Sequence, residues 1–384
     1  MDRKLLMHVG PTMIDLDVLL SGVRNNTGFA SPEFISAMRN SLNGLKYVMK
    51  APDYTPFILP GSGTIGMESI TSLLKKGDDV LITSSGVFGD RWKSIFERYP
   101  VNYKLLRSAP GEIVDEYAIM EELEKKHYKM VTMTHVETST GARFPVKKIA
   151  EKIRNKTDII VVDAVASAAA EELKVQDWGI DVCLTGSQKA LASPPGAALL
   201  VLSPNAISHL SDNSVSGFYT NLNSWLKVMD NFENNKSGYF TTLPVHLIFS
   251  LEKSFELIKK ETIEKRVERH EMVASSIREG ISKIGMEIMA KENCRSNTVT
   301  AMMLAGINMN DFLNYCIENG IEMATGIIPE FAGKYVRIGH MGWINENDAI
   351  STIAVIERAL IKFGKPIDLG SGLNATQKYL VKFK

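Results

Sequence analysis

The stretch VCLTGSQKALASPPGAALLVLS, residues 182–203, places one lysine between two apolar runs. Both runs, 182–188 and 197–203, are rich in aliphatic residues, which is typical of strands buried on both faces of a sheet. Lys189 lies in the small-residue turn between them, and no other residue of the stretch is charged. Because burying an ammonium group is costly, this position indicates a chemical role for the lysine.

Similar apolar runs recur upstream and alternate with amphipathic segments. This alternation predicts an α/β domain with a largely parallel sheet. A long polar connection at 205–242 separates this part from a strongly helical segment at 245–284. Strands at 296–304 and 334–339 and a last helix at 346–363 then predict a second, α+β unit. The upstream strands are expected at 79–85, 103–108, 129–138 and 158–165, and the helices at 69–76, 90–99, 115–126 and 146–155.

The composition favours a small-molecule partner over nucleic acid or a membrane. Lysine plus arginine and aspartate plus glutamate each number 44, so no net field attracts a polyanion or an acidic lipid surface. The three cysteines are widely spaced and lack metal-ligand spacing, which predicts a reducing compartment and no metal site. Neither a signal peptide nor an apolar run of membrane-spanning length is evident. We expect a soluble cytoplasmic protein.

Residues 60–66 contain the pattern Gly61-x-Gly63-x-x-Gly66, which matches a dinucleotide-binding fingerprint. A dinucleotide site would need an uninterrupted strand before the pattern and an acidic residue at the end of the next strand. Pro56 and Pro60 interrupt the preceding stretch, and the next strand ends in serines. We therefore interpret Ser62, Gly63 and Thr64 as a turn that leads into a helix whose free N–H groups bind a phosphate, with a plain tight turn as the alternative.

Polar and aromatic residues follow the predicted strands, where ligands bind in open α/β sheets. Asp163 ends the strand at 158–165, and alone it could simply cap the next turn. A buried lysine amine is a nucleophile toward aldehydes, and a lysine Schiff base with an aspartate at the ring nitrogen marks pyridoxal phosphate enzymes. Lys189, Asp163 and the phosphate turn together therefore predict this cofactor. His135, Thr138 and Phe88 also follow strands, and each has a purely structural alternative.

The chain resembles the class V aminotransferases of the alanine–glyoxylate and serine–pyruvate type, which are fold-type I pyridoxal phosphate enzymes. The resemblance covers nearly the whole chain. It implies a large cofactor domain with a mostly parallel seven-stranded sheet and a smaller C-terminal α+β domain. With it we expect an N-terminal arm at 1–20, a large domain at 21–255 and a small domain at 256–384. The motifs that carry it are GPT (10–12), SPEF (31–34), PGSGT (60–64), GVFGDRW (86–92), HVETSTG (135–141), VDAVAS (162–167), GSQKALASPPG (186–196), YFTTLPV (239–245) and VRIGHMG (336–342).

The resemblance also implies a role for each matching residue. Lys189 would bind the cofactor covalently and move a proton, and Asp163 would keep the ring nitrogen protonated. Arg337 would bind the substrate carboxylate, with backbone of Gly10 and Pro11 nearby. Family members are homodimers with shared active sites, so Tyr239 and Thr242 would reach the partner's cofactor phosphate. The remaining cofactor contacts would be Phe88 stacked on the ring, Val165 on its other face, Thr138 near the ring hydroxyl, and Ser62, Gly63, Thr64 and Gln188 at the phosphate.

Two departures bear on the substrate and on the reaction. Phe29 and Ala30 stand before SPEF, where many relatives have His-Arg, so a substrate contact from that loop is not expected. Gln188 precedes the lysine, where the related cysteine desulfurases have histidine. The resemblance therefore implies transfer of an amino group from alanine or serine to glyoxylate or pyruvate by a ping-pong mechanism. The alternatives are donors such as 2-aminoethylphosphonate, hydroxykynurenine or ureidoglycine, a cysteine desulfurase, and a nicotinamide oxidoreductase.

Overall fold

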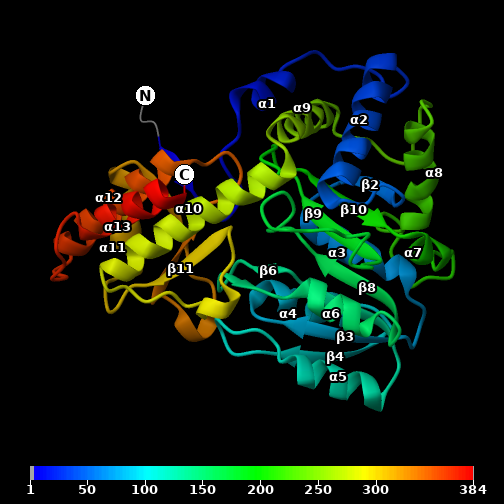
Figure 1. The fold of residues 1–384 in the computed structure, drawn as a ribbon. Helices are drawn as coiled ribbons and strands as arrows, with labels where there is room; N and C mark the ends of the chain where they lie inside the picture. The colour runs from blue at the N-terminus through cyan, green and yellow to red at the C-terminus, as the bar shows by residue number, and fades with distance from the viewer. Residues whose placement is uncertain (1–3, 384) are drawn as a thin grey trace.

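A computed structural model describes residues 4–383. Its larger part is a seven-stranded sheet in the order β2-β10-β9-β8-β5-β3-β4 (Figure 1). β10 runs antiparallel to both of its neighbours, and the other pairings in the sheet are parallel. The predicted mostly parallel, seven-stranded sheet is thus confirmed. The strands are β2 (Thr55–Pro60), β3 (Asp79–Ser84), β4 (Asn102–Arg107), β5 (Tyr128–Thr134), β8 (Thr157–Asp163), β9 (Val182–Gly186) and β10 (Ala197–Leu202).

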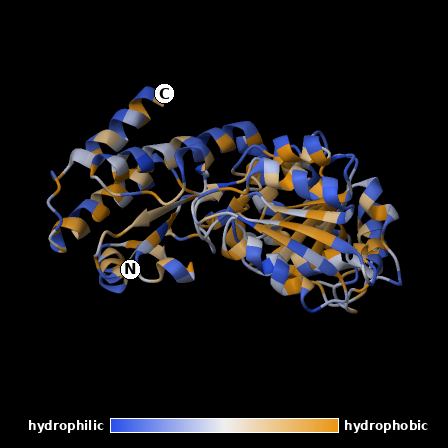
Figure 2. Ribbon diagram, turned by 90° about the horizontal axis from the view of Figure 1, so that it is seen from below, coloured by the Kyte–Doolittle hydropathy of each residue, from blue (hydrophilic) through white to orange (hydrophobic). Residues whose placement is uncertain are grey.

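Helices enclose this sheet and bury its aliphatic strands. Figure 1 shows α2, α8 and α9 gathered on the β2 side of the molecule and α4, α5 and α6 on the β4 side. In Figure 2 the strands are mostly orange, while the helices around them alternate between blue and orange, as amphipathic helices do. The central strands are therefore apolar on both faces. The helices are α2 (Pro32–Met49), α3 (Gly63–Ser69), α4 (Val87–Phe96), α5 (Glu116–Lys125), α6 (Val146–Ile153), α7 (Pro204–Ser208), α8 (Leu222–Glu233) and α9 (Val245–Glu261).

A second sheet with its own apolar core is built from the C-terminal third of the chain and β1 (Leu5–Met7). Its order is β1-β12-β13-β11, and β1 pairs in parallel with β12. The segment expected to form an N-terminal arm therefore contributes a strand to the C-terminal sheet. The other elements are β11 (Val299–Met303), β12 (Ile321–Thr325), β13 (Tyr335–Gly339), α10 (Ile263–Lys283), α11 (Met309–Glu318), α12 (Glu346–Lys362) and α13 (Ser371–Phe383).

The junction between α9 and α10 divides the helical segment predicted at 245–284. Thr262 has φ of 72°, a conformation that helices of L-residues avoid, and its hydroxyl accepts a hydrogen bond from the backbone N–H of Lys265. α9 packs against α2, whereas α10 packs against α12 and α13. The chain therefore passes from one core to the other at this residue. The domain limits at 20/21 and 255/256 stay predictions.

Four expectations about single elements were wrong. β2 exists although it contains Pro56 and Pro60, because an edge strand tolerates residues that cannot donate to a neighbour. The helix expected at 69–76 begins at Gly63 and continues only as a 3-10 turn to Leu73. The polar connection contains α7 and α8. A further helix, α13, follows the helix that was expected to be the last.

Three further elements are short. α1 (Leu16–Ser21) follows β1, and the hairpin of β6 (Val136–Glu137) and β7 (Ala142–Arg143) follows β5. In the part of the chain that the structure describes, no helix is at once long and apolar enough to cross a lipid bilayer.

Candidate active site

A cavity of about 250 Å³ lies where strands of the large sheet end. Asp163 is the last residue of β8, and Lys189 follows the end of β9. Arg337 reaches the same cavity from β13 of the second sheet. The predicted residues that line it are Gly10, Ser62, Gly63, Thr64, Phe88, Thr138, Asp163, Val165, Gln188, Lys189 and Arg337.

The Lys189 amine is buried, with 8% of the residue exposed, and its Nζ donates a hydrogen bond to the backbone carbonyl of Val9. Burial, followed by the positive charge of Arg337, lowers the pKa of Lys189 from 10.5 to about 8. About a tenth of this amine is therefore neutral at pH 7, far more than for an ordinary lysine, and the neutral form is a nucleophile and a proton acceptor.

The Asp163 carboxylate is buried beside Lys189 on the neighbouring strand. Its Oδ1 accepts a hydrogen bond of 2.8 Å from the backbone N–H of Val165, and within residues 4–383 its Oδ2 accepts none. Burial raises the pKa of Asp163 to about 6, and the nearby Glu137 adds to the rise. A buried carboxylate with one free oxygen is a suitable partner for a protonated ring nitrogen.

One side of the cavity is built to receive an anion. Ser62 is the N-cap of α3, and its side chain makes no capping hydrogen bond. Arg91 donates from Nη1 to Oγ1 of Thr64 over 3.0 Å, and its guanidinium lies 4.8 Å from the centre of the Phe88 ring. The N–H groups that begin a helix and a guanidinium together favour a phosphate group at this point.

Two glycines leave space at the cavity wall. A Cβ atom on Gly63 would lie 2.8 Å from Cγ2 of Val165, and one on Gly10 would lie 2.6 Å from Cδ of Lys189. Gly10 also has φ of 118°, which L side chains rarely adopt. Both positions therefore require glycine if Val165 and Lys189 are to keep their places.

Arg337 is 6% exposed and has no acidic partner within residues 4–383. Its Nε donates to the carbonyl of Thr325 over 2.8 Å and its Nη1 to the carbonyl of Thr138 over 3.2 Å. Among residues 4–383 no carboxylate lies within 4.0 Å of its guanidinium nitrogens. Burial lowers its pKa. An unpaired guanidinium in a cavity suits a carboxylate ligand.

Three predicted residues lie outside this cavity. Tyr239 is 65% exposed, and its ring stacks on Phe29 with centroids 5.7 Å apart. Thr242 and Pro11 are also exposed. Their assignments to the partner's phosphate and to the substrate therefore stay predictions.

Six lining residues were not singled out from the sequence. For Arg91 a signal was available, because it follows Phe88 by three positions on one helix and so shares its face. His8 carries an imidazole whose pKa is lowered, chiefly by burial, so the ring is neutral near neutral pH. The six are His8, Val9, Met67, Arg91, Val136 and Ala166.

The residues of the cavity fit pyridoxal phosphate. A nucleophilic amine, a buried carboxylate, an aromatic ring and an anion-binding edge surround one space, and an unpaired guanidinium faces it from the second sheet. A lysine and an aspartate are the partners that this cofactor's aldehyde and ring nitrogen need. The fold and the site together define a fold-type I pyridoxal phosphate-dependent transferase.

The comparisons with known proteins agree with this class. The model of the family "Aminotransferase class-V" matches residues 20–334. The chain is 35% identical to an uncharacterized aminotransferase of Methanocaldococcus jannaschii, over 99% of this chain and 98% of that protein. It is 33% identical to alanine–glyoxylate aminotransferase 1 of Saccharomyces cerevisiae, over 82% and 86% of the two chains.

A solved structure shows the same architecture over nearly the whole chain. The ureidoglycine–glyoxylate aminotransferase of Bacillus subtilis superposes with a TM-score of 0.90 at 27% identity, covering 98% of this chain and 97% of that one. The chain therefore belongs to the class-V aminotransferases. It is an enzyme of that family, and its cofactor is pyridoxal phosphate.

Proposed function

We propose that this aminotransferase moves the amino group of a small amino acid, alanine or serine, to glyoxylate or pyruvate by a ping-pong mechanism. The observation that carries the proposal is one cavity of about 250 Å³ that holds Lys189, Asp163 and the unpaired Arg337. This space is shared between cofactor and substrate, which favours substrates with short side chains. The yeast and Bacillus relatives are both named for glyoxylate, which supports that acceptor.

When bound, pyridoxal phosphate supplies an aldehyde that takes up the amino group and a ring that accepts electrons from the bond at the substrate's Cα. Lys189 would hold the cofactor covalently at rest. Once the substrate's amino group has displaced it, its freed Nζ would take the proton from the substrate's Cα. The free oxygen of Asp163 holds a proton on the ring nitrogen. Phe88 and Val165 would hold the ring between them, and Thr138 would contact the ring hydroxyl.

Arg337 selects the substrate by its carboxylate. Its fork of N–H groups orients the carboxylate so that the amino group points toward Lys189. The same arginine binds the 2-oxo acid in the second half of the cycle, because both substrates carry a carboxylate next to the reacting carbon.

Ser62, Gly63, Thr64 and Gln188 would hold the phosphate of the cofactor, with Arg91 beside Thr64. We propose that Tyr239 and Thr242 complete this contact from the second subunit of a homodimer. Both residues are exposed and outside the cavity of their own chain. Leu16, Leu20 and Val23, in and just after α1, are 55–77% exposed, which supports burial against another subunit.

A cysteine desulfurase is not favoured by the positions of the cysteines. Cys183, Cys294 and Cys316 are all buried, and none lines the cavity. Burial raises the pKa of each thiol, to about 12 for Cys316, so none has the thiolate character that sulfur chemistry needs.

The experiment that tests the proposal begins with purified chain reconstituted with pyridoxal phosphate. We expect a yellow protein, and borohydride followed by peptide mass spectrometry should place the reduced cofactor on Lys189. A screen of amino donors, followed by the loss of visible absorbance, should then rank alanine and serine above bulky donors and above 2-aminoethylphosphonate. A colourless protein, or cofactor fixed on another lysine, would refute the assigned site, and a preference for the phosphonate would refute the proposed donor class.

A further inference from the structure

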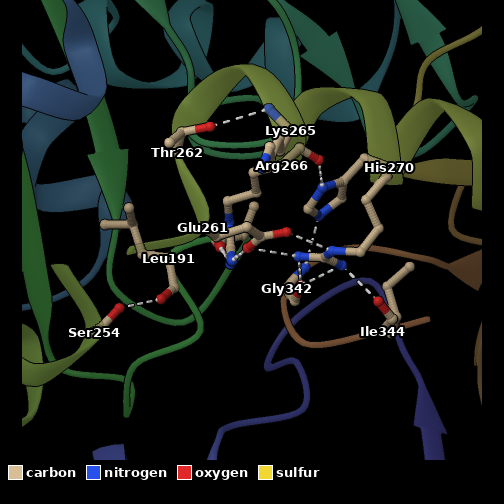
Figure 3. A network of polar contacts seen from close by, with 11 residues as sticks. Leu191, Ser254, Glu261, Thr262, Lys265, Arg266, His270, Gly342 and Ile344 are labelled. Atoms are coloured by element: carbon tan, nitrogen blue, oxygen red, sulfur yellow. Dashed lines mark hydrogen bonds and ion pairs between the residues drawn. The ribbon is translucent and has the colours of Figure 1, made fainter. Parts of the chain in front are cut away.

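Three successive backbone carbonyls, starting at Lys189 itself, accept hydrogen bonds from side chains of three separate segments: the loop after β1, α10 and α9. The carbonyl of Lys189 accepts from Oγ1 of Thr12 over 2.8 Å, and that of Ala190 accepts from Nη2 of Arg266 over 2.7 Å. The carbonyl of Leu191 accepts from the hydroxyl of Ser254 on α9, as Figure 3 shows. The backbone that carries the lysine is therefore fixed from outside its own turn.

Arg266, which holds the middle carbonyl, is a fully buried cation in the first turn of α10. Its exposed fraction is 0%, and its Nη1 donates to Oε2 of Glu261 over 2.6 Å. Its guanidinium also lies 5.1 Å from the Trp343 ring. Burying a guanidinium requires such partners, so the position of Arg266 depends on the Glu261 carboxylate.

Glu261 binds a second arginine at the same time. Nε and Nη2 of Arg269 donate to its two carboxylate oxygens over 2.6 and 3.1 Å, which is a bidentate geometry (Figure 3). Burial alone would raise the pKa of Glu261, but the hydrogen bonds and charges of the two arginines outweigh it and hold this pKa below its usual range. Glu261 is therefore a carboxylate shared between two guanidiniums.

Arg269 extends the cluster to the chain segment that follows Arg337. Its Nη1 donates to the carbonyl of Ile344 over 2.5 Å and to that of Gly342 over 3.2 Å. His270 joins the same segment, because its Nε2 accepts from the N–H of Gly342 while its Nδ1 donates to the carbonyl of Arg266. The residues just beyond β13 are thus tied to the start of α10.

These contacts meet at the junction where α9 ends and α10 begins. Through Arg266, these contacts reach the carbonyl of the residue after Lys189. Through Arg269, they reach the carbonyls of the segment after Arg337. We propose that Glu261, Arg266 and Arg269 are positioning residues that hold the lysine turn of the large sheet and the arginine strand of the second sheet in one geometry. The inference rests on the proposed roles of Lys189 and Arg337 and adds residues that touch neither cofactor nor substrate.

The test compares Glu261→Gln with Glu264→Gln in the full reconstituted enzyme. Glu264 is a matched control, because it lies three residues further along the chain, in the first turn of α10, and pairs with Lys50 at 2.8 Å, but its side chain is 69% exposed. Three measurements are made on each variant: the pH midpoint of the visible absorbance of the bound cofactor, the dissociation constant of an unreactive carboxylate such as propionate, and the maximal rate of the half-reaction with alanine.

We expect Glu261→Gln to shift the pH midpoint of the cofactor absorbance and to raise the dissociation constant of propionate several-fold. The half-reaction should slow about tenfold or more, because small displacements of reacting groups cost this much in rate. Glu264→Gln should match the unaltered enzyme in all three. A Glu261→Gln variant that melts at a lower temperature but keeps its midpoint, propionate affinity and rate would overturn the inference, since the cluster would then serve stability alone.

Failure of the proposed function gives a different result. If borohydride does not fix cofactor on Lys189 of the unaltered chain, both the proposed function and this inference are refuted. If fixation is normal and Glu261→Gln changes none of the three measurements, this inference alone is refuted. Should Glu261→Gln not fold, Arg269→Lys decides by the same measurements, because it keeps the charge and loses the bidentate fork.

Discussion

The guanidinium of Arg91 donates to the hydroxyl of Thr64 over 3.0 Å, joining α4 to the first turn of α3. The same guanidinium lies 4.8 Å from the centre of the Phe88 ring. One side chain therefore touches both the proposed phosphate turn and the proposed stacking ring. This contact was not foreseen from the sequence, although Arg91 stands within the GVFGDRW motif.

Arg91→Ala should weaken cofactor binding about tenfold to a hundredfold, the loss expected for a hydrogen bond to a charged group. Titration of the apoprotein with pyridoxal phosphate measures the loss. Titration with pyridoxal, which lacks the phosphate, should give the same affinity for both proteins. Lys93→Ala on the same helix is the control, because this lysine makes a 3.7 Å surface ion pair and is 43% exposed. An equal loss for pyridoxal would contradict a phosphate contact.

Arg337→Ala should raise the KM for carboxylate substrates about a hundredfold, because a buried bidentate partner is lost. The visible spectrum of the bound cofactor should remain largely intact. Steady-state kinetics and absorbance on the same sample check both statements, with the exposed Arg98→Ala as control. Loss of the cofactor itself would show that the role of Arg337 is misassigned.

Capture of cofactor by the apoprotein should depend on pH through Lys189. The pKa of this amine is lowered to about 8, so below that pH it is protonated and cannot attack an aldehyde. The rate should rise about tenfold per pH unit up to pH 8 and then level off. Stopped-flow absorbance between pH 6 and about 10 measures the profile. A rate that keeps rising toward the ordinary lysine value of 10.5 would mean that the amine is not desolvated.

Tyr239→Phe should weaken cofactor binding about tenfold without changing the unfolding free energy, because its hydroxyl has no hydrogen bond among residues 4–383. The loss of affinity should appear only in the dimer. Cofactor titrations at protein concentrations above and below the dimer dissociation constant therefore compare binding by the dimer with binding by the monomer. Analytical ultracentrifugation supplies that constant. A monomer that binds cofactor with full affinity would disprove the shared site.

Glu137→Gln should reduce the free energy of unfolding by about 1–3 kcal/mol. This buried carboxylate accepts hydrogen bonds from the N–H groups of Phe88, Gly89 and Ser139 and from the hydroxyl of Ser139, and an amide nitrogen would face some of these donors. Urea denaturation measures the change, and Glu124→Gln, exposed on α5, should show none. An unchanged midpoint for Glu137→Gln would mean that the turn can rearrange.

The parts of the fold that the sequence predicts well are those with a short-range pattern. The strands around Asp163 and Lys189 are continuous aliphatic runs that end in polar residues, so both their existence and the edge where they end could be read directly. α8 was missed because polar residues around Asn221 and Asn234 dominate its composition, although Trp225, Met229 and Phe232 form a buried stripe.

Contacts between residues far apart in the chain leave no comparable short-range pattern in the sequence. The pattern of 245–284 indicates helical structure throughout, and nothing in it marks the break at Thr262, where φ is 72° and the Arg266–Glu261 hydrogen bond spans the junction. Arg337 was placed at the site by resemblance, and nothing local to its strand indicates which carbonyls hold it. Which residues share a cavity depends on how the two sheets meet, and that is decided by side chains far apart in the chain.

The pairing of β1 with β12 determines the order in which parts of the active site can form during synthesis of the chain. Leu5 is synthesised before every strand of the large sheet, and its partner Ile321 is synthesised after all of them. Val9 and Gly10, which touch the Lys189 side chain, follow directly on that strand. A nascent chain can thus build the large sheet early, yet the wall beside its lysine is in place only once the C-terminal sheet has been synthesised. Truncated products of translation should accordingly fold in part and remain without cofactor.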